Sequence, residues 1–236
     1  MSVADLLAAD YAERLRSYGT RAPGRFVELV AGLVVVGLGV PEPWGVQVAV
    51  LVPDPDPVDV ASAVAWCRER DRDPQVVVRA RCRDRFPDYA VVEELGALVA
   101  SAEAEQDVLA IELATDVAEF RAVYGGSFGM RPGVAEGLVV EADLEAVPHL
   151  LGRVDGRAVA CAQLRIGDGR GFVSGVGVLP DVQGRGCGSA MLAACRDEAG
   201  RRGCDLVWLT AGPANVPFYV SIGFELVDVH VALSAP

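Results

Sequence analysis

The hydrophobic positions in the first half of the chain fall into short valine-rich runs separated by amphipathic stretches. Runs at residues 26–36, 46–52 and 75–82 predict strands, because β-branched side chains favour extended backbone. Residues 54–71 begin in a Pro- and Asp-rich stretch, place Val60, Val64 and Cys67 on one face, and therefore predict a helix. The other predicted elements of this half are helices at 1–19 and 87–102 and a strand at 107–113.

The second half repeats this alternation from residue 115 onwards. Asp155 and Gly156 separate two apolar runs and predict a β-hairpin, since this dipeptide favours the tight turn that joins paired strands. A helix at 186–201 is predicted to bury Met191, Leu192, Cys195 and Ala199. No element is predicted for residues 129–137. The other predicted elements are helices at 115–129 and 214–223 and strands at 150–154, 157–166, 171–179, 205–210 and 224–233.

Both halves close with the order β-α-β-α-β, which suggests an internal repeat. Gly96 and Gly223 each follow a predicted short helix and precede a closing strand. We interpret the chain as an α/β protein made of two diverged copies, at residues 1–107 and 108–236. A single α/β domain with chance similarity is the alternative.

Charge and cysteine content restrict the class of partner. The net charge is −12, which argues against nucleic acid because a phosphate backbone is bound by basic surface. All 21 basic residues are Arg, so a bound phosphate would be held by guanidinium or backbone N–H groups. Six scattered cysteines and two histidines favour reduced, buried thiols in a cytoplasmic protein, without a metal site. The apolar run at 26–40 is too short to span a membrane and is better interpreted as two buried strands. The N-terminal segment is a poor signal peptide.

The segment "PDVQGRGCG" at residues 180–188 lies between a predicted strand and a predicted helix. Its glycines free consecutive N–H groups beside a helix N-terminus, where the helix dipole favours an anion. The corresponding segment of the first half, "PDPDPVD" at 53–59, offers prolines without N–H groups and carboxylates that repel phosphate. The chain has no lysine for a P-loop, and Ser189 and Met191 stand where a dinucleotide-binding fingerprint needs glycine.

Two motifs resemble those of the GNAT superfamily of N-acetyltransferases. "VLPDVQGRGCG" at 178–188 is similar to the family's pyrophosphate-binding pattern V-x-P-x-x-[QR]-x-x-G-x-[GA], and "FYVSIGF" at 218–224 is similar to its [LF]-Y-x-x-x-G-F stretch. The resemblance implies a mixed sheet with flanking helices and acetyl-CoA as co-substrate. It implies Tyr219 as the acid that protonates the leaving thiolate. It also implies cofactor contacts from Val176, Gly177, Val178, Gln183, Gly184, Arg185, Gly186, Cys187, Gly188 and Ser189.

Glycines at 175 and 177 independently predict a bulge in their strand, or simply close packing under a helix. For the general base, Glu141, Asp143, Glu145, His149 and a water chain to solvent all remain open. The expected activity is acetyl transfer from acetyl-CoA directly to an amine on a small molecule or peptide, with a homodimer possible and no membrane partner. The alternatives are a catalytically silent CoA-binding sensor or scaffold and a nucleotide-binding α/β domain.

Overall fold

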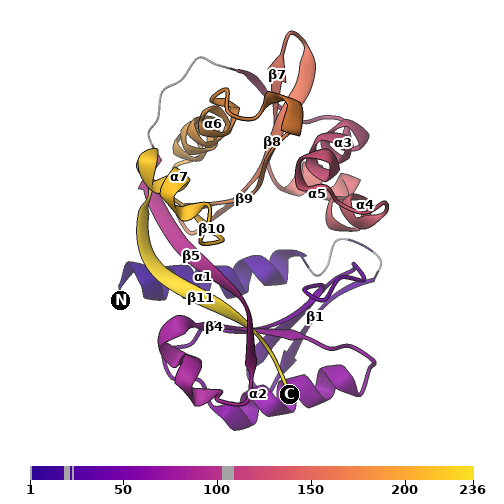
Figure 1. The fold of residues 1–236 in the computed structure, drawn as a ribbon, viewed down its shortest axis with the longest axis vertical. Coiled ribbons are helices and arrows are strands. Elements are labelled where there is room, and N and C mark those ends of the chain that lie inside the picture. The colour runs from indigo at the N-terminus through magenta and orange to yellow at the C-terminus, as the bar shows by residue number, and fades with distance from the viewer. Residues whose placement is uncertain (1, 19–21, 23, 103–108) are drawn as a thin grey trace. The chain divides into compact units, whose positions relative to one another are not determined.

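The computed structural model describes residues 2–18, 22, 24–102 and 109–236, which form a mixed α/β protein (Figure 1). Their contacts divide the chain into two compact units. The first unit comprises residues 1–98 and 210–236, and the second comprises residues 99–209. Each unit is described by itself.

The first unit contains a mixed sheet whose strands follow the order β1-β2-β3-β4-β11-β5. Strands β1, β2 and β3 pair antiparallel, whereas β3 and β4 run parallel and are connected through α2. The elements are α1 (Val3–Tyr18), β1 (Arg25–Val30), β2 (Leu33–Leu38), β3 (Val46–Val50), α2 (Pro57–Arg68), β4 (Gln75–Arg79), a 3-10 helix η1 (Ala80–Arg85), β5 (Ala90–Ser101), α7 (Val216–Ser221) and β11 (Glu225–Ser234).

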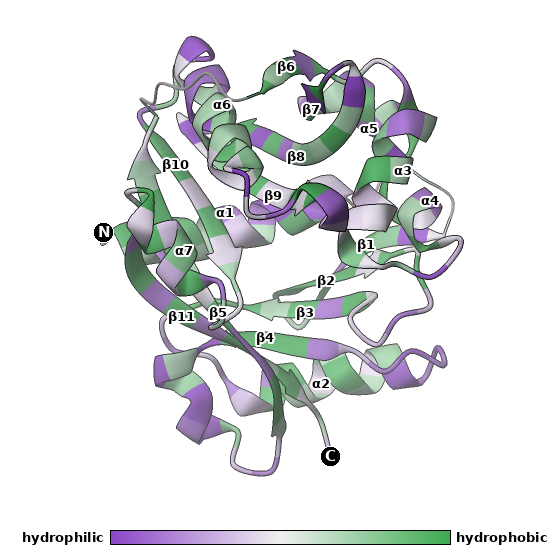
Figure 2. Ribbon diagram, turned by 45° about the horizontal axis from the view of Figure 1, so that its top comes forward, coloured by the Kyte–Doolittle hydropathy of each residue, from purple (hydrophilic) through white to green (hydrophobic). Residues whose placement is uncertain are grey.

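Helix α2 packs its apolar face on the valine-rich strands, whose central parts are largely hydrophobic (Figure 2). Asp56 caps its N-terminus by accepting a hydrogen bond of 2.8 Å from the Val58 N–H. Val60, Val64 and Cys67 are buried, which confirms the predicted face. The core of this unit therefore follows from the hydrophobic pattern.

The apolar run at 26–40 forms two strands, β1 and β2, as predicted, because Ala31 and Gly32 both adopt positive φ, 49° and 78°, and turn the chain. The first of them, β1, is only partly buried. One predicted element of the first unit is wrong. Residues 87–102 form the long strand β5 rather than a helix. Their Glu, Leu and Ala residues are good helix formers, but sheet pairing overrides this intrinsic preference.

The alignment of Gly96 with Gly223 is consequently also wrong. Gly96 lies within β5, where an added Cβ would lie 2.9 Å from Leu226 Cδ1 and 3.1 Å from Val216 Cγ2. Gly223 instead follows α7 in a left-handed conformation with a φ of 91°. The first glycine permits close packing and the second ends a helix.

The second unit contains strands in the order β10-β9-β8-β7-β6. The predicted hairpin around Asp155 and Gly156 is confirmed, with φ values of 50° and 79°. Helix α6 begins where it was predicted and buries Met191, Leu192, Cys195 and Ala199. The elements are β6 (Ala110–Leu113), α3 (Val117–Phe128), α4 (Val134–Leu138), α5 (Glu141–Ala146), β7 (His149–Val154), β8 (Arg157–Gly167), β9 (Arg170–Val178), a 3-10 helix η2 (Pro180–Val182), α6 (Cys187–Arg201) and β10 (Leu206–Ala211).

The two units share one succession of elements. In each, two antiparallel pairings are followed by a helix and a parallel strand, as β1-β2-β3-α2-β4 and as β7-β8-β9-α6-β10. This order supports the proposal of two diverged copies. The compact units divide the chain differently from the predicted halves, because β11 pairs with β4 of the first unit. The predicted boundary at 107/108 lies outside the described residues.

Candidate functional site

The pairing of β8 with β9 changes register at the glycine-rich part of β9. Cys161 pairs with Gly177, whereas Gln163, two residues further along β8, pairs with Ser174, three residues back along β9. The extra residue forms a bulge, and Gly175 within it adopts a φ of 60°. The bulge predicted from Gly175 and Gly177 is confirmed.

The same glycines allow helix α3 to approach the bulge closely. A Cβ on Gly175 would lie 2.9 Å from Tyr124 Cε2, and a Cβ on Gly177 would lie 2.7 Å from Ser127 Cβ. Both distances are too short for real atoms, so neither position has room for a side chain. Close packing and the bulge therefore occur together, and the two interpretations of these glycines do not exclude each other.

A buried chain of hydrogen bonds ends at the bulge. The Nδ1 atom of His149 donates to the Val147 carbonyl at 2.8 Å, which leaves Nε2 of the neutral ring as an acceptor. Nε2 of Gln163 donates to it at 2.9 Å, and Oε1 of Gln163 accepts from Ser174 Oγ at 3.3 Å. His149 and Gln163 are almost completely buried. Gln163 was missed in the sequence, although a glutamine inside the apolar run "AVACAQL" is a signal for a buried polar network.

Cys161 lies on β8 opposite the bulge and is not a nucleophile. Its Sγ contacts the Gly175 carbonyl at 3.6 Å. Burial raises the pKa of the thiol to about 12, so it stays protonated near neutral pH. This thiol fills space beside Gly177, where an added Cβ would lie 3.1 Å from the sulfur.

The loop between η2 and α6 is attached to the end of β9. Nε2 of Gln183 donates to the Val178 carbonyl at 3.0 Å, and Nη2 of Arg185 donates to the Asp181 carbonyl at 3.3 Å. Arg157 forms an ion pair with Asp181 at 2.5 Å, and this hydrogen-bonded guanidinium lowers the pKa of the Asp181 carboxyl. These contacts hold the loop beside the strand that contains the bulge.

The loop presents backbone N–H groups at the start of a 15-residue helix. Gly184 and Gly186 adopt φ values of 76° and 83°, and Gly186 caps α6 without a side-chain hydrogen bond. Ala190 donates to the Gly186 carbonyl, and the N–H groups of residues 184–189 have no hydrogen-bond acceptor in the described part of the chain. Unbonded N–H groups at a helix N-terminus suit a phosphate. The loop thus fits the pyrophosphate that its motif implies.

The ten predicted cofactor contacts all lie in the second unit, on β9, in this loop and in the first turn of α6. Gln183, Gly184, Arg185 and Gly186 are exposed, which suits a binding loop. Cys187 points into the core and is 3% exposed, so it fills space at the start of the helix.

Tyr219 lies on α7 in the first unit, where its ring packs against Phe218 and Phe224. Burial raises the pKa of its phenol, which keeps the proton on the oxygen at neutral pH. Within the described residues the hydroxyl has no hydrogen-bond partner. It is therefore not held in a structural hydrogen bond, as an ordinary buried tyrosine would be.

The four candidates for the general base divide into two pairs. Asp143 is buried and accepts a hydrogen bond of 2.9 Å from the Val140 N–H at the start of α5, and His149 belongs to the buried chain already described. Glu141 and Glu145 are exposed on α5. Asp143 and His149 thus have structural roles, and no geometry selects a base. No group of three or more His, Cys, Asp and Glu side chains that could hold a metal ion occurs among the described residues.

Comparison with known proteins identifies the family. Residues 117–224 match the model of the acetyltransferase (GNAT) family. This part of the chain belongs to the GNAT family. The match contains the glycine loop, β9 and Tyr219, so the resemblance seen in the two motifs is confirmed.

Solved GNAT structures have the same fold along the whole chain. A GCN5-related N-acetyltransferase from Kribbella flavida is 20% identical, with a TM-score of 0.73 over 100% of this chain and 96% of that one. A second, from Sphaerobacter thermophilus, is 17% identical, with a TM-score of 0.63 over 98% of this chain and 90% of that one. At these identities the likeness shows the fold. No helix in the described ranges is both long and apolar enough to cross a membrane.

Proposed function

We propose that this GNAT protein transfers an acetyl group from acetyl-CoA directly to an amine, without an acyl-enzyme. One observation carries the proposal. The bulge of β9 is followed directly by a loop whose N–H groups are unbonded at the N-terminus of α6. A strand with exposed backbone and an anion-binding helix start are the two features that a thioester linked to a pyrophosphate requires.

The backbone of the second unit supplies the binding groups. The N–H groups of residues 184–189 would hold the pyrophosphate, and Arg185, exposed beside them, would add a guanidinium donor. The backbone of Val176, Gly177 and Val178 would hold the acetyl carbonyl and the pantetheine. When bound, acetyl-CoA supplies an activated thioester carbonyl for attack by the amine.

Two proton transfers complete the reaction. The amine must lose a proton to attack the carbonyl, and we assign this to solvent because no buried carboxylate or imidazole is unengaged at the described site. The leaving thiolate must gain a proton, and we assign its donation to Tyr219. The raised pKa of this phenol keeps it protonated at neutral pH until the thiolate leaves. Direct transfer needs these groups and correct positioning, but no protein nucleophile.

The acceptor we propose is a cationic amine on a small molecule or a peptide. The net charge of −12 attracts cations to the protein over a distance of about 10 Å at moderate ionic strength. The same charge disfavours nucleic acid and phosphorylated acceptors.

The test is release of free CoA thiol from acetyl-CoA across a panel of amines, with the wild-type protein and two variants. Tyr219→Phe removes the proposed acid and should lower kcat about 100-fold. Tyr89→Phe is the matched control, because Tyr89 also packs edge-on against a phenylalanine, Phe86, and burial also raises its pKa. The control should keep the wild-type rate.

The outcome also separates the alternatives. Binding of CoA without turnover of any amine would favour the sensor or scaffold and contradict the proposed activity. A rise in melting temperature with ATP or NAD but not with CoA would favour a nucleotide-binding domain and contradict the assignment of the loop.

A further inference from the structure

The first unit contains a cavity that is lined by residues of this unit alone. Its volume is about 340 Å³, within the range of small-molecule sites. One face of α1 forms one wall, and the ends of β2 and β3 form the others. Apart from the polar end described below and Arg16 on α1, whose charge is paired with Glu13 at 3.1 Å, its lining is apolar. The side chains that shape it include Ala8, Ala9, Ala12, Leu33, Val34 and Leu51.

Small side chains on α1 leave this space open. Ala8, Ala9 and Ala12 face strands that present larger residues, such as Leu33 and Leu51. Protein interiors are normally packed to the density of organic crystals, so a hollow of this size is a feature that larger residues at the alanine positions would remove. Its apolar walls suit an apolar ligand.

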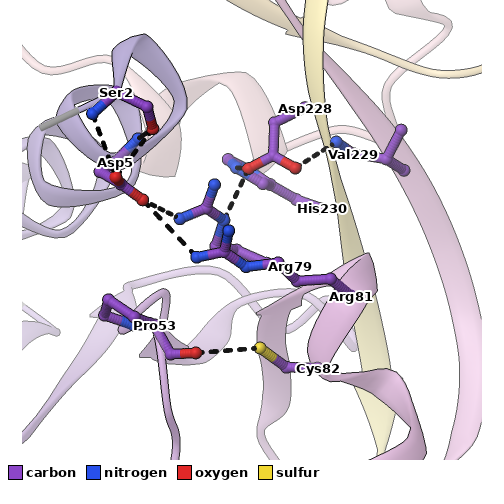
Figure 3. A network of polar contacts seen from close by, with 9 residues as sticks. All are labelled: Ser2, Asp5, Pro53, Arg79, Arg81, Cys82, Asp228, Val229 and His230. Atoms are coloured by element: carbon purple, nitrogen blue, oxygen red, sulfur yellow. Dashed lines mark hydrogen bonds and ion pairs between the residues drawn. The ribbon is translucent and has the colours of Figure 1, made fainter.

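The polar end of the cavity is formed by Arg79 on β4 and Asp5 on α1 (Figure 3). Arg79 is 2% exposed, and its guanidinium lies between two carboxylates. Nη1 donates to Asp5 Oδ1 at 2.6 Å, and Nε lies 2.7 Å from Asp228 Oδ2 on β11. The guanidinium is therefore held by carboxylates from two other elements, α1 and β11.

Of the two charged residues at this end that line the cavity, Arg79 and Asp5, only Arg79 has an unbonded group that is not fully enclosed; Asp228 Oδ2, which is enclosed, makes only its ion pair with Arg79. Nη2 of Arg79 has no hydrogen-bond partner among the described residues, and it is not among the fully enclosed polar atoms. The oxygens of Asp5 are engaged, because Oδ2 accepts from the N–H and the hydroxyl of Ser2 and Oδ1 faces Arg79 and Arg81. A ligand in this cavity would thus meet a free N–H donor and no free acceptor on Asp5.

The charges at this end already balance. Arg79 and Arg81 carry two positive charges, and Asp5 and Asp228 carry two negative ones. An added ion would be desolvated without a counter-charge, which is costly. An uncharged carbonyl oxygen accepts a hydrogen bond from a guanidinium without that penalty.

We propose that this cavity is a second ligand site, which binds a small apolar molecule through an uncharged amide or ester carbonyl. The carbonyl oxygen accepts from Arg79 Nη2, and the apolar chain lies between the alanines of α1 and the strands. None of the residues that form this site is among those proposed to bind acetyl-CoA or to act on it.

Ligand-observed NMR with two six-carbon probes tests the proposal on the full-length protein. Hexanamide carries an uncharged carbonyl, whereas hexylamine carries an ammonium group that only donates. The wild-type protein should bind hexanamide and should bind hexylamine at least tenfold more weakly. Equal binding of the two probes, or no binding of hexanamide at millimolar concentration, would overturn the proposal.

Ala12→Leu tests the location, because the larger side chain fills the cavity and leucine is a good helix former. It should weaken hexanamide binding at least tenfold. Ala65→Leu is the matched control, since Ala65 is exposed on α2 away from the cavity, and it should leave binding unchanged. Thermal melting of both variants verifies folding. Unchanged hexanamide binding in a folded Ala12→Leu protein would place the ligand elsewhere and refute the site.

Discussion

Gln163 and Ser174 are joined by a side-chain hydrogen bond of 3.3 Å at the paired position beside the β9 bulge. The backbone of the next residues, Gly175 and Val176, departs from regular pairing before Gly177 pairs with Cys161. Gln163 in turn is fixed by His149 through a bond of 2.9 Å. The polar chain therefore reaches the bulge from the buried side of the sheet, and it fixes the position from which the proposed acetyl-binding backbone departs.

Replacing Gln163 by leucine should weaken both stability and acetyl-CoA binding. The variant leaves the His149 ring and the Ser174 hydroxyl without their partner, which costs about 1–3 kcal/mol of unfolding free energy. We also expect several-fold weaker acetyl-CoA binding, because the bulge loses its support. Urea unfolding and calorimetric titration measure the two effects. Ser174→Ala, which removes only the last bond, should have the smaller effect, and an unaltered affinity in Gln163→Leu would show that the chain serves stability alone.

Gly177→Ala should destabilise the protein by about 1–3 kcal/mol, the usual cost of overpacking. The reason is the 2.7 Å separation between the added Cβ and Ser127 Cβ. A double-mutant cycle with Ser127→Gly checks this cause, because removing the opposing Cβ should recover part of the loss. Strictly additive effects of the two substitutions would contradict it.

The loop glycines can be tested against a glycine with the same backbone conformation elsewhere. Gly186 and Gly169 have φ values of 83° and 72°, and an added Cβ would meet nothing within 4 Å at either position. Alanine at each should cost roughly 1–2 kcal/mol from the left-handed conformation alone. Only Gly186→Ala should also weaken CoA binding, by tenfold or more in a titration. Equal affinities of the two variants would remove the loop from the binding site.

His230 should make stability fall as the pH is lowered. Burial holds the pKa of this fully buried imidazole at about 4, against 6.5 in the unfolded chain. The unfolded state therefore takes up a proton between pH 6.5 and pH 4 that the folded state does not, so the free energy of unfolding decreases across this range, by up to roughly 3 kcal/mol.

Urea unfolding measured from pH 7.5 to pH 4 follows this decrease. His230→Leu replaces the imidazole with an apolar side chain of similar size that does not titrate. It should flatten the dependence of the unfolding free energy on pH between pH 6.5 and pH 5, above the range in which carboxylates take up protons. An unchanged slope in the variant would assign the pH dependence to other groups.

Features decided by neighbouring residues could be predicted from the sequence. The turn at Asp155 and Gly156, the start of α6 after three glycines and the capped start of α2 depend on backbone preferences within a few positions. The glycine loop belongs to this class, because its left-handed residues and its helix are adjacent in the chain. The family followed from these local patterns.

Features decided by contacts between distant residues could not be predicted in this way. Residues 87–102 have a composition that suits a helix, yet they form β5, because partners elsewhere in the chain satisfy their backbone groups. The chain from His149 to Ser174 and the pairing of Arg79 with Asp5 and Asp228 join positions that no spacing rule connects. The sequence alone determined the local geometry of the glycine loop and the family that its motif resembles. The tertiary structure alone decided the support behind the bulge and the cavity under α1, because both arise from packing between segments far apart in the chain.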